Sequence, residues 1–362
     1  MEKVIAESQK LLQNKKTSSK CRVSLFTMLQ QLVVVTQDHM APYFRSLVSD
    51  IVNALADKNG TLKLQALVFL RLVATEMPLK TVQKEIPVLV ESVAPCIDEE
   101  WYKLVAEALR VISVFANSFA NQNSEKQAEI DGIEDINGCF KTLFIAAFKR
   151  FAENDIDQEI KECSILAMGD IIATAGDKCA TECKNNNVFP ILLERLRNEV
   201  TRMAALKTIT KIAGAPLSID FHGVLEDIVL ELSAFLRQTL RILRQAALIA
   251  LDSIISTKGQ DMSLELFGNV LRETAALVKP TDLHLSYLSL RVAANALRIN
   301  GSNAKHVQQY LLEHKIYLFL QPLFLKLYMY QIPHLLKNIQ FHPHKLFFLL
   351  SQVRQLFPSL LF

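Results

Sequence analysis

The residues with the greatest potential for chemistry are the cysteines and histidines, and their spacing offers few reactive sites. Cys179 and Cys183 are four residues apart and can share one helix face, as two metal ligands would. No further Cys or His lies near enough in the sequence to complete a tetrahedral site. His342 and His344 are separated by Pro343 and have no acidic residue close by. We therefore expect no metal and no cofactor.

The short motifs that organise catalysis are missing from the sequence. It contains no glycine loop for phosphate, no GxSxG elbow, no HExxH and no CxxC pair. The isolated His39, His222 and His284 fall at expected helix starts or turns, where capping explains them. Because no acid, base and nucleophile converge, we expect no enzyme activity and no small-molecule substrate. Function then depends on a surface that binds another protein.

Overall charge and composition narrow the class of protein. Of the 362 residues, 50% are hydrophobic, and the formal net charge is +3. No Arg/Lys block or basic and aromatic interleaving is present, so nucleic acid is not an expected partner. The six cysteines are scattered through apolar helices, which is typical of a reduced, intracellular protein. The N-terminal segment MEKVIAESQKLLQ is amphipathic and lacks the apolar core of a signal peptide.

The helices that position these residues follow a repeat. A small residue followed by a large apolar one recurs in the middle of apolar helices, at intervals of about 42 residues. Residues four and eight further on are also apolar, so each set lies along one helical stripe. The one long interval contains an insertion. The copies begin at Ser24, Ala66, Ala108, Ser164, Ala205, Ala247 and Ser289.

This period predicts an all-α fold, a right-handed α-solenoid of stacked HEAT-type helix pairs. We expect about seven pairs in residues 1–300. The insertion, residues 119–135, has five acidic residues against one Lys and is expected to be a solvated loop, with a docking segment for a basic partner as the alternative.

Residues 301–362 form a divergent hydrophobic and aromatic segment, which could be helical and is out of the repeat register. Its run at 316–330 is interrupted by Gln321, Pro322 and Lys326 and is shorter than the roughly 20 apolar residues of a spanning helix, so membrane insertion is not expected. A degenerate final repeat and a sequence that is not native to the fold both remain open.

Charged residues recur near the turn inside each pair. Basic residues stand three positions before the small residue in four copies, and in HEAT units such positions form a ladder between adjacent repeats with acidic turn residues such as Asp57 and Asp157. We interpret these four as structural: Lys63, Lys161, Arg202 and Arg244. The turns of copies five and six are basic instead of acidic, and Arg is favoured at interfaces. Their arginines are our candidates for partner binding and are expected to be exposed: Arg195, Arg197, Arg237 and Arg241.

Several long stretches resemble one family, that of the cullin-associated, neddylation-dissociated protein, also called the TATA-binding-protein-interacting protein. They match in order and spacing across residues 18 to about 297, the middle of a much longer protein. They are 56–73 (ADKNGTLKLQALVFLRLV), 100–111 (EWYKLVAEALRV), 155–163 (DIDQEIKEC), 193–220 (LERLRNEVTRMAALKTITKIAGAPLSID) and 235–255 (FLRQTLRILRQAALIALDSII).

The resemblance implies a solenoid that wraps an unneddylated cullin bound to its RING subunit and speeds the exchange of substrate receptors, without transferring ubiquitin. It implies a monomer within a hetero-complex, in the cytoplasm and nucleus. The family's two gripping ends lie outside the matched part. An importin-type transport receptor and a phosphatase scaffold subunit are alternatives. The first would show acidic inner helices, whereas the acids here cluster in turns and one loop.

Overall fold

The computed structural model describes the chain except residues 120–135, 155–156, 217–218, 222, 280 and 300–362. Its described elements are α-helices and short 3₁₀ helices, with no strand among them, which confirms the predicted all-α class. They form two compact units, Met1–Asp220 and Phe221–Phe362. The inserted loop, apart from Phe119, and the divergent segment lie outside the described residues, so their assignments stay predictions.

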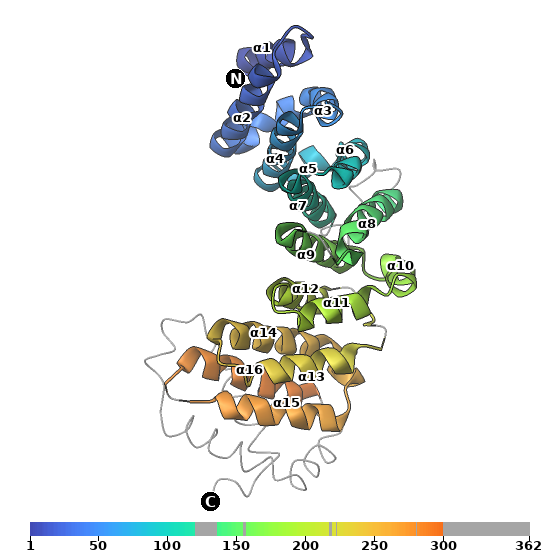
Figure 1. Cartoon of the computed structure of the whole chain (residues 1–362). Coiled ribbons are helices and arrows are strands. Elements are labelled where there is room, and N and C mark those ends of the chain that lie inside the picture. The colour runs from blue at the N-terminus through green and yellow to red at the C-terminus, as the bar shows by residue number, and fades with distance from the viewer. Residues whose placement is uncertain (120–135, 155–156, 217–218, 222, 280, 300–362) are drawn as a thin grey trace, which may run out of the picture. The chain divides into compact units, whose positions relative to one another are not determined.

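Among its described residues, the first unit contains five helix pairs (Figure 1). Their first helices are α1 (Glu2–Gln13), α3 (Ala41–Leu55), α6 (Ile86–Val93), α8 (Ile136–Ala152) and α11 (Val188–Arg197). Their second helices are α2 (Ser19–Thr36), α4 (Gly60–Glu76), α7 (Tyr102–Ser118), α9 (Gln158–Ala175) and α12 (Arg202–Ala213).

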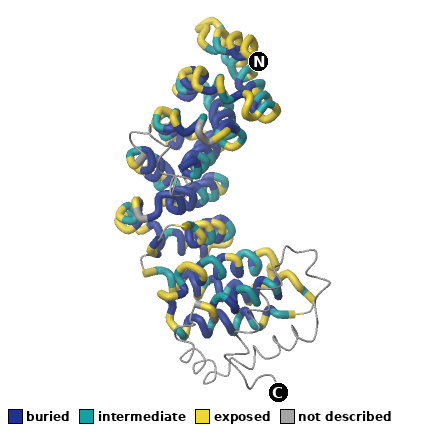
Figure 2. Tube along the Cα trace, turned by 180° about the vertical axis from the view of Figure 1, so that it is seen from behind, coloured by how far each residue is buried: buried dark blue, intermediate teal, exposed yellow. Residues whose placement is uncertain are grey.

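The second helices stack directly on one another within this unit. α2 packs on α4, α4 on α7, α7 on α9 and α9 on α12. Polar side chains begin several of them, because Ser18, Asn59 and Asp157 each accept a hydrogen bond from an N–H in the first turn of their helix. Buried residues lie where helices pack against each other, and exposed residues lie along their outer sides and in the turns (Figure 2).

The small residues of the repeat allow this close stacking. Ala66, Ala108 and Ala205 are completely buried. The helices also approach closely at Gly169 of α9, where an added Cβ would lie 2.8 Å from Cγ2 of Thr208 in α12. Ser24, at the same repeat position in α2, is exposed, unlike its buried counterparts.

The predicted first helices of copies three and five are each broken in two. In copy three, α5 (Leu79–Gln83) ends before α6, whose first turn contains Pro87, a residue that lacks an N–H and so favours a helix start. In copy five, η5 (Gly176–Cys179) and α10 (Ala180–Asn185) precede α11, and Asn187 between α10 and α11 has a φ of 52°. Asn tolerates this left-handed conformation, which ends a helix.

The second unit contains two helix pairs in its described residues. They are α13 (Leu225–Phe235) with α14 (Arg241–Lys258) and α15 (Leu264–Leu277) with α16 (Leu283–Ile299). The 3₁₀ turn η6 (Gly259–Asp261) joins the pairs, and α14 packs on α16 as the second helices do in the first unit. Ala247 and Ser289 are buried at the repeat positions. Among the described helices of both units, none is long and apolar enough to cross a membrane.

Candidate partner-binding surfaces

Ion pairs connect the second helix of one repeat to the turn of the next. Arg22 of α2 bonds Asp57 at 3.0 Å, and Lys63 of α4 bonds Glu99 at 2.5 Å. The predicted ladder is therefore confirmed for Lys63 and for Asp57. These pairs connect neighbouring repeats in the stack.

Arg202 and Arg244 are structural, as predicted, and each contacts the turn of its own repeat. Nη2 of Arg202 donates to the carbonyl oxygen of Arg197 at 3.1 Å, and Nη2 of Arg244 donates to that of Thr239 at 3.4 Å. Both guanidinium groups therefore bind carbonyls of their own repeat, because short turns bring the end of the preceding helix within reach of the side chain. Asp157 caps its own helix, accepting from the N–H of Glu159 at 2.8 Å.

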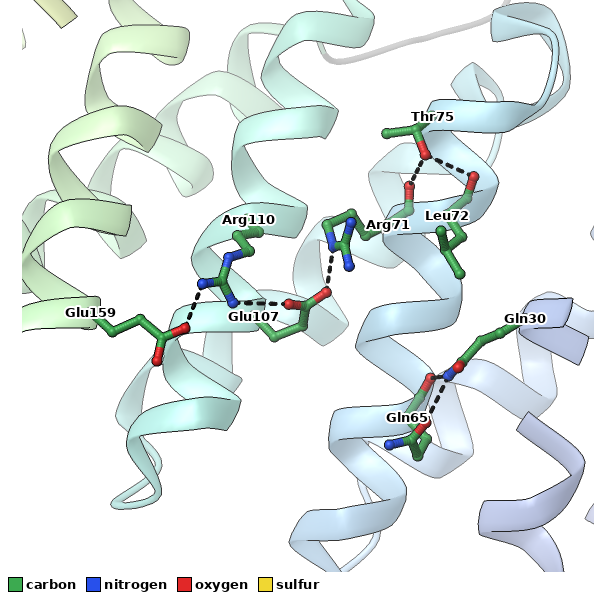
Figure 3. A network of polar contacts seen from close by, with 8 residues as sticks. All are labelled: Gln30, Gln65, Arg71, Leu72, Thr75, Glu107, Arg110 and Glu159. Atoms are coloured by element: carbon green, nitrogen blue, oxygen red, sulfur yellow. Dashed lines mark hydrogen bonds and ion pairs between the residues drawn. The ribbon is translucent and has the colours of Figure 1, made fainter. Parts of the chain in front are cut away.

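A second polar network runs across α4, α7 and α9 (Figure 3). The carboxylate of Glu107, which is buried in α7, accepts from Nε of Arg71 at 2.5 Å and from Nη1 of Arg110 at 3.1 Å. Arg110 also bonds Glu159 at 2.5 Å. A buried carboxylate requires such partners. The sequence pattern did not identify this network, because Glu107 lies within an otherwise apolar stretch.

The same helix row contains another buried acid, Asp170 of α9. Its carboxylate accepts from Ser113 of α7 and from Lys211 of α12, and Lys211 also donates to Asn117 at 2.8 Å. One side chain thus links three consecutive repeats. These groups satisfy one another, so we assign them to holding the stack.

Arg195 does not fit the prediction that it is an exposed contact residue. It is buried in α11, and its Nη2 donates to the carbonyl oxygens of Phe151 at 3.1 Å and Glu153 at 2.9 Å. Burial lowers the pKa of its guanidinium. The side chain closes the end of α8 in the preceding repeat, which is a structural role that spacing alone could not distinguish from exposure.

The other three predicted arginines are exposed. Arg197 belongs to the first unit, and Arg237 and Arg241 belong to the second, so the structure does not combine the four into one described site. Arg237 bonds Glu273 at 2.7 Å. Arg241 bonds both oxygens of Asp282, at 2.6 and 3.0 Å. Hydrogen bonds from Arg241, and then from the N–H of Leu285, lower the pKa of Asp282 to about 2.

The two cysteines considered as metal ligands lie together in the interior. Sγ of Cys183 is 3.8 Å from Sγ of Cys179, which itself lies 3.2 Å from the carbonyl oxygen of Gly176. In the part of the chain that the structure describes, no group of three or more His, Cys, Asp or Glu residues could hold a metal ion. The pair therefore lacks the further ligands that a structural zinc site needs.

Comparison with known proteins agrees with the stretches that suggested a family. A family model described as CAND1-like, TPR repeats matches residues 40–168. The chain is 34% identical over 301 residues to cullin-associated NEDD8-dissociated protein 1 of Arabidopsis thaliana, covering 82% of this chain. It is 31% identical over 283 residues to the protein of that name in Dictyostelium discoideum, covering 78%. The chain belongs to the cullin-associated NEDD8-dissociated protein family.

The match to the family is partial in length. The chain spans 24% of the Arabidopsis protein and 22% of the Dictyostelium protein. It is also 30% identical to cullin-associated NEDD8-dissociated protein 2 of Rattus norvegicus over 314 residues, which are 86% of this chain and 24% of that protein. Although the family model is described by TPR repeats, the spacing from Ala66 to Ala108 exceeds the roughly 34 residues of that repeat and fits HEAT or armadillo units.

Solved structures agree with the solenoid class. The designed armadillo repeat protein YIII(Dq)4CqI aligns over 69% of this chain and 99% of its own, with a TM-score of 0.52 and 15% identity. A related design, YIII(Dq.V1)4CPAF in complex with peptide (KR)4, gives a TM-score of 0.54, 16% identity and the same coverage. At such identities the likeness shows the fold alone, and the described helices belong to the armadillo and HEAT class of α-solenoid.

Proposed function

We propose that this chain is a non-catalytic binding protein that associates with an unneddylated cullin carrying its RING subunit. The observation that carries the proposal is similarity to proteins named as cullin-associated, which extends over 78 to 86% of the chain. The stacked helix pairs of each described unit support it, because repeat folds of this kind bind partners through the surfaces of their helices.

The contact residues that we propose are the exposed Arg197 in the first unit and, separately, Arg237 and Arg241 in the second. Arg237 and Arg241 are bonded to acids that are themselves largely shielded, so the positive charge faces outward. A guanidinium can bind a second carboxylate through its remaining N–H groups, because it has five donors. Acidic residues on a cullin would contact Arg237 and Arg241.

The test is a pull-down with purified components. The immobilised chain is incubated with unneddylated or neddylated cullin–RING complex, with a full-length family member as positive control. We expect retention of the unneddylated complex and reduced retention of the neddylated one. Failure to retain either, while the full-length protein retains the unneddylated form, would exclude independent binding.

A charge-reversal pair tests the proposed contact. Arg237→Glu with Arg241→Glu should weaken cullin binding by about tenfold or more, as for removal of interface arginines. The matched control, Lys20→Glu with Lys84→Glu, makes the same change in net charge at exposed residues of the first unit. If both double variants weaken cullin binding equally, the effect comes from the change in net charge, and Arg237 and Arg241 make no specific contact with the cullin.

We further propose that the chain contributes to exchange of substrate receptors in cullin–RING ligases, and so to assembly of SCF complexes, as a monomer in a hetero-complex in the cytoplasm and nucleus. Because it covers about a quarter of its relatives, the rate effect is expected to be smaller than that of a full-length member. Receptor dissociation followed by fluorescence transfer, with and without the chain, measures the effect. No change in the dissociation rate would mean that the chain binds the ligase without promoting exchange. Light scattering tests whether the chain is a monomer, and cell imaging tests its location.

A further inference from the structure

Three large apolar side chains are exposed at two neighbouring turns of the second unit. Leu240 and Ile242 begin α14 and are 58% and 62% exposed, and Leu283 begins α16 and is 46% exposed. We call these three residues, with Arg237 and Arg241, the turn patch. Single exposed apolar residues are ordinary, whereas a group is typical of an interaction site.

An ion pair brings the two turns together. Nε and Nη2 of Arg241 donate to the two oxygens of Asp282 at 2.6 and 3.0 Å. Arg241 stands between Leu240 and Ile242, and Asp282 directly precedes Leu283. The two-pronged bond therefore brings the start of α14, with Leu240 and Ile242, close to the start of α16, with Leu283.

Folding of the unit does not account for the leucine at position 240. Leu240 is the N-cap of α14 and makes no side-chain capping bond, whereas Ser263 caps α15 at 3.3 Å and Asp282 caps α16 at 3.0 Å. A polar N-cap would stabilise the helix by about 1 kcal/mol. An exposed leucine gives no compensating burial. Its presence is better explained by contact with another molecule.

The charges of the turn patch define what that molecule carries. The side chains of Arg237 and Arg241 are 64% and 51% exposed, and their partners Glu273 and Asp282 only 18% and 25%. The exposed Lys279 and His284 adjoin Asp282 in the sequence and add no acidic group. The exposed charge of the turn patch is therefore positive. It comes from Arg237 and Arg241, which stand close in the sequence to Leu240 and Ile242.

We propose that the turn patch docks an acidic, apolar segment of a partner protein. Apolar side chains of the segment cover Leu240, Ile242 and Leu283, and flanking carboxylates accept hydrogen bonds from Arg237 and Arg241. This deepens the proposed function, because it names the chemistry of the partner segment. It depends on that function only in the identity of the protein that carries the segment.

Two fluorescein-labelled peptides of equal length test the chemistry by fluorescence anisotropy with the whole chain. One alternates Leu and Glu, and the other alternates Leu and Lys. We expect the acidic peptide to bind and to be weakened by salt, and the basic peptide to bind at least tenfold less. Binding of both peptides with similar affinity, or of neither, would overturn the proposal.

A double variant locates the binding. Leu240→Ser with Ile242→Ser should weaken the acidic peptide at least tenfold, whereas Leu230→Ser, which changes an exposed leucine of α13, should not. The melting temperature is the control for folding. It should hold or rise in the double variant, because the serine introduced at the N-cap of α14 would supply the missing capping bond. Unchanged peptide affinity in the double variant would remove the turn patch as the site.

The cullin pull-down separates this inference from the proposed function. If the acidic peptide binds at the turn patch and no cullin is retained, the patch is supported and the cullin proposal fails. If cullin is retained equally by the wild type and by Leu240→Ser with Ile242→Ser, and the peptide does not bind, the patch fails and the cullin proposal stands.

Discussion

Arg71 of α4 donates from Nε to the buried carboxylate of Glu107 in the next helix of the stack, at 2.5 Å. Removal of the carboxylate leaves Arg71 and Arg110 without their shared partner. Because both arginines are partly exposed, we expect Glu107→Ala to lower the free energy of unfolding by about 2 kcal/mol, below the 3 to 5 kcal/mol of a fully buried pair. Urea unfolding followed by circular dichroism measures it.

The exposed pair of Glu7 and Lys10 is the control for that variant. Their side chains are 2.6 Å apart and mostly exposed. Glu7→Ala should change stability by less than about 0.5 kcal/mol, since solvent screens such pairs. An equal loss in the two variants would mean that burial of Glu107 adds nothing to the network.

Gly169 is expected to tolerate no side chain. Its substitution by Ala would place a Cβ 2.8 Å from Cγ2 and 3.1 Å from Cβ of Thr208, too close for α9 and α12 to keep their spacing. Overpacking of this kind costs about 1 to 3 kcal/mol, which exceeds the gain in helix propensity from Gly to Ala. Thermal unfolding of Gly169→Ala measures the loss.

Thr208→Ala should partly restore the stability of Gly169→Ala, because it removes the Oγ1 and Cγ2 atoms that the new methyl group meets. The comparison variant is Gly60→Ala, whose Cβ would meet its nearest atom, in Trp101, at 3.4 Å and should be close to neutral. Additive losses in the double variant would contradict a direct contact between positions 169 and 208.

Much of the fold follows from sequence because stacking imposes a periodic demand. The small residues at 66, 108 and 205 must let helices approach, and the structure buries all three. Ser24 shows the limit of that rule, since it occupies the same repeat position in α2 and is exposed. The breaks at Pro87 and Asn187 depend on local backbone chemistry that the 42-residue period does not record.

The candidate site was less predictable, because an Arg in a turn can point either way. Arg195 and Arg197 are two residues apart, so they lie on different sides of α11, and one closes a buried helix end while the other is exposed. The turn patch could have been suspected from the sequence, because Leu240 occupies a position where a polar N-cap residue is expected.

Asp282 should titrate well below its ordinary range. The hydrogen bonds from Arg241 and from the N–H of Leu285 lower its pKa from 3.8 to about 2. Because this pKa is lower in the folded state than in the unfolded chain, the ionised carboxylate stabilises the folded state at pH values above about 4. This contribution is lost as the pH falls from about 4 through about 2. NMR titration of the carboxylate in the folded chain should give a midpoint near 2, and Arg241→Gln should raise it. A midpoint near 3.8 in the wild type would show that the pair does not form in solution.

The thiols should differ sharply in reactivity. Cys21 is partly exposed, whereas Cys96, Cys139, Cys163, Cys179 and Cys183 are buried and reduced. Burial raises the pKa of Cys96 and of Cys163 to about 11, so at pH 8 only about one molecule in a thousand carries either thiolate. We expect one fast thiol per folded chain with a disulfide reagent at pH 8, and six after denaturation in guanidinium. Cys21→Ser should abolish the fast phase. A fast phase that survives this substitution would mean that the helix pairs open and expose buried cysteines on the timescale of the reaction.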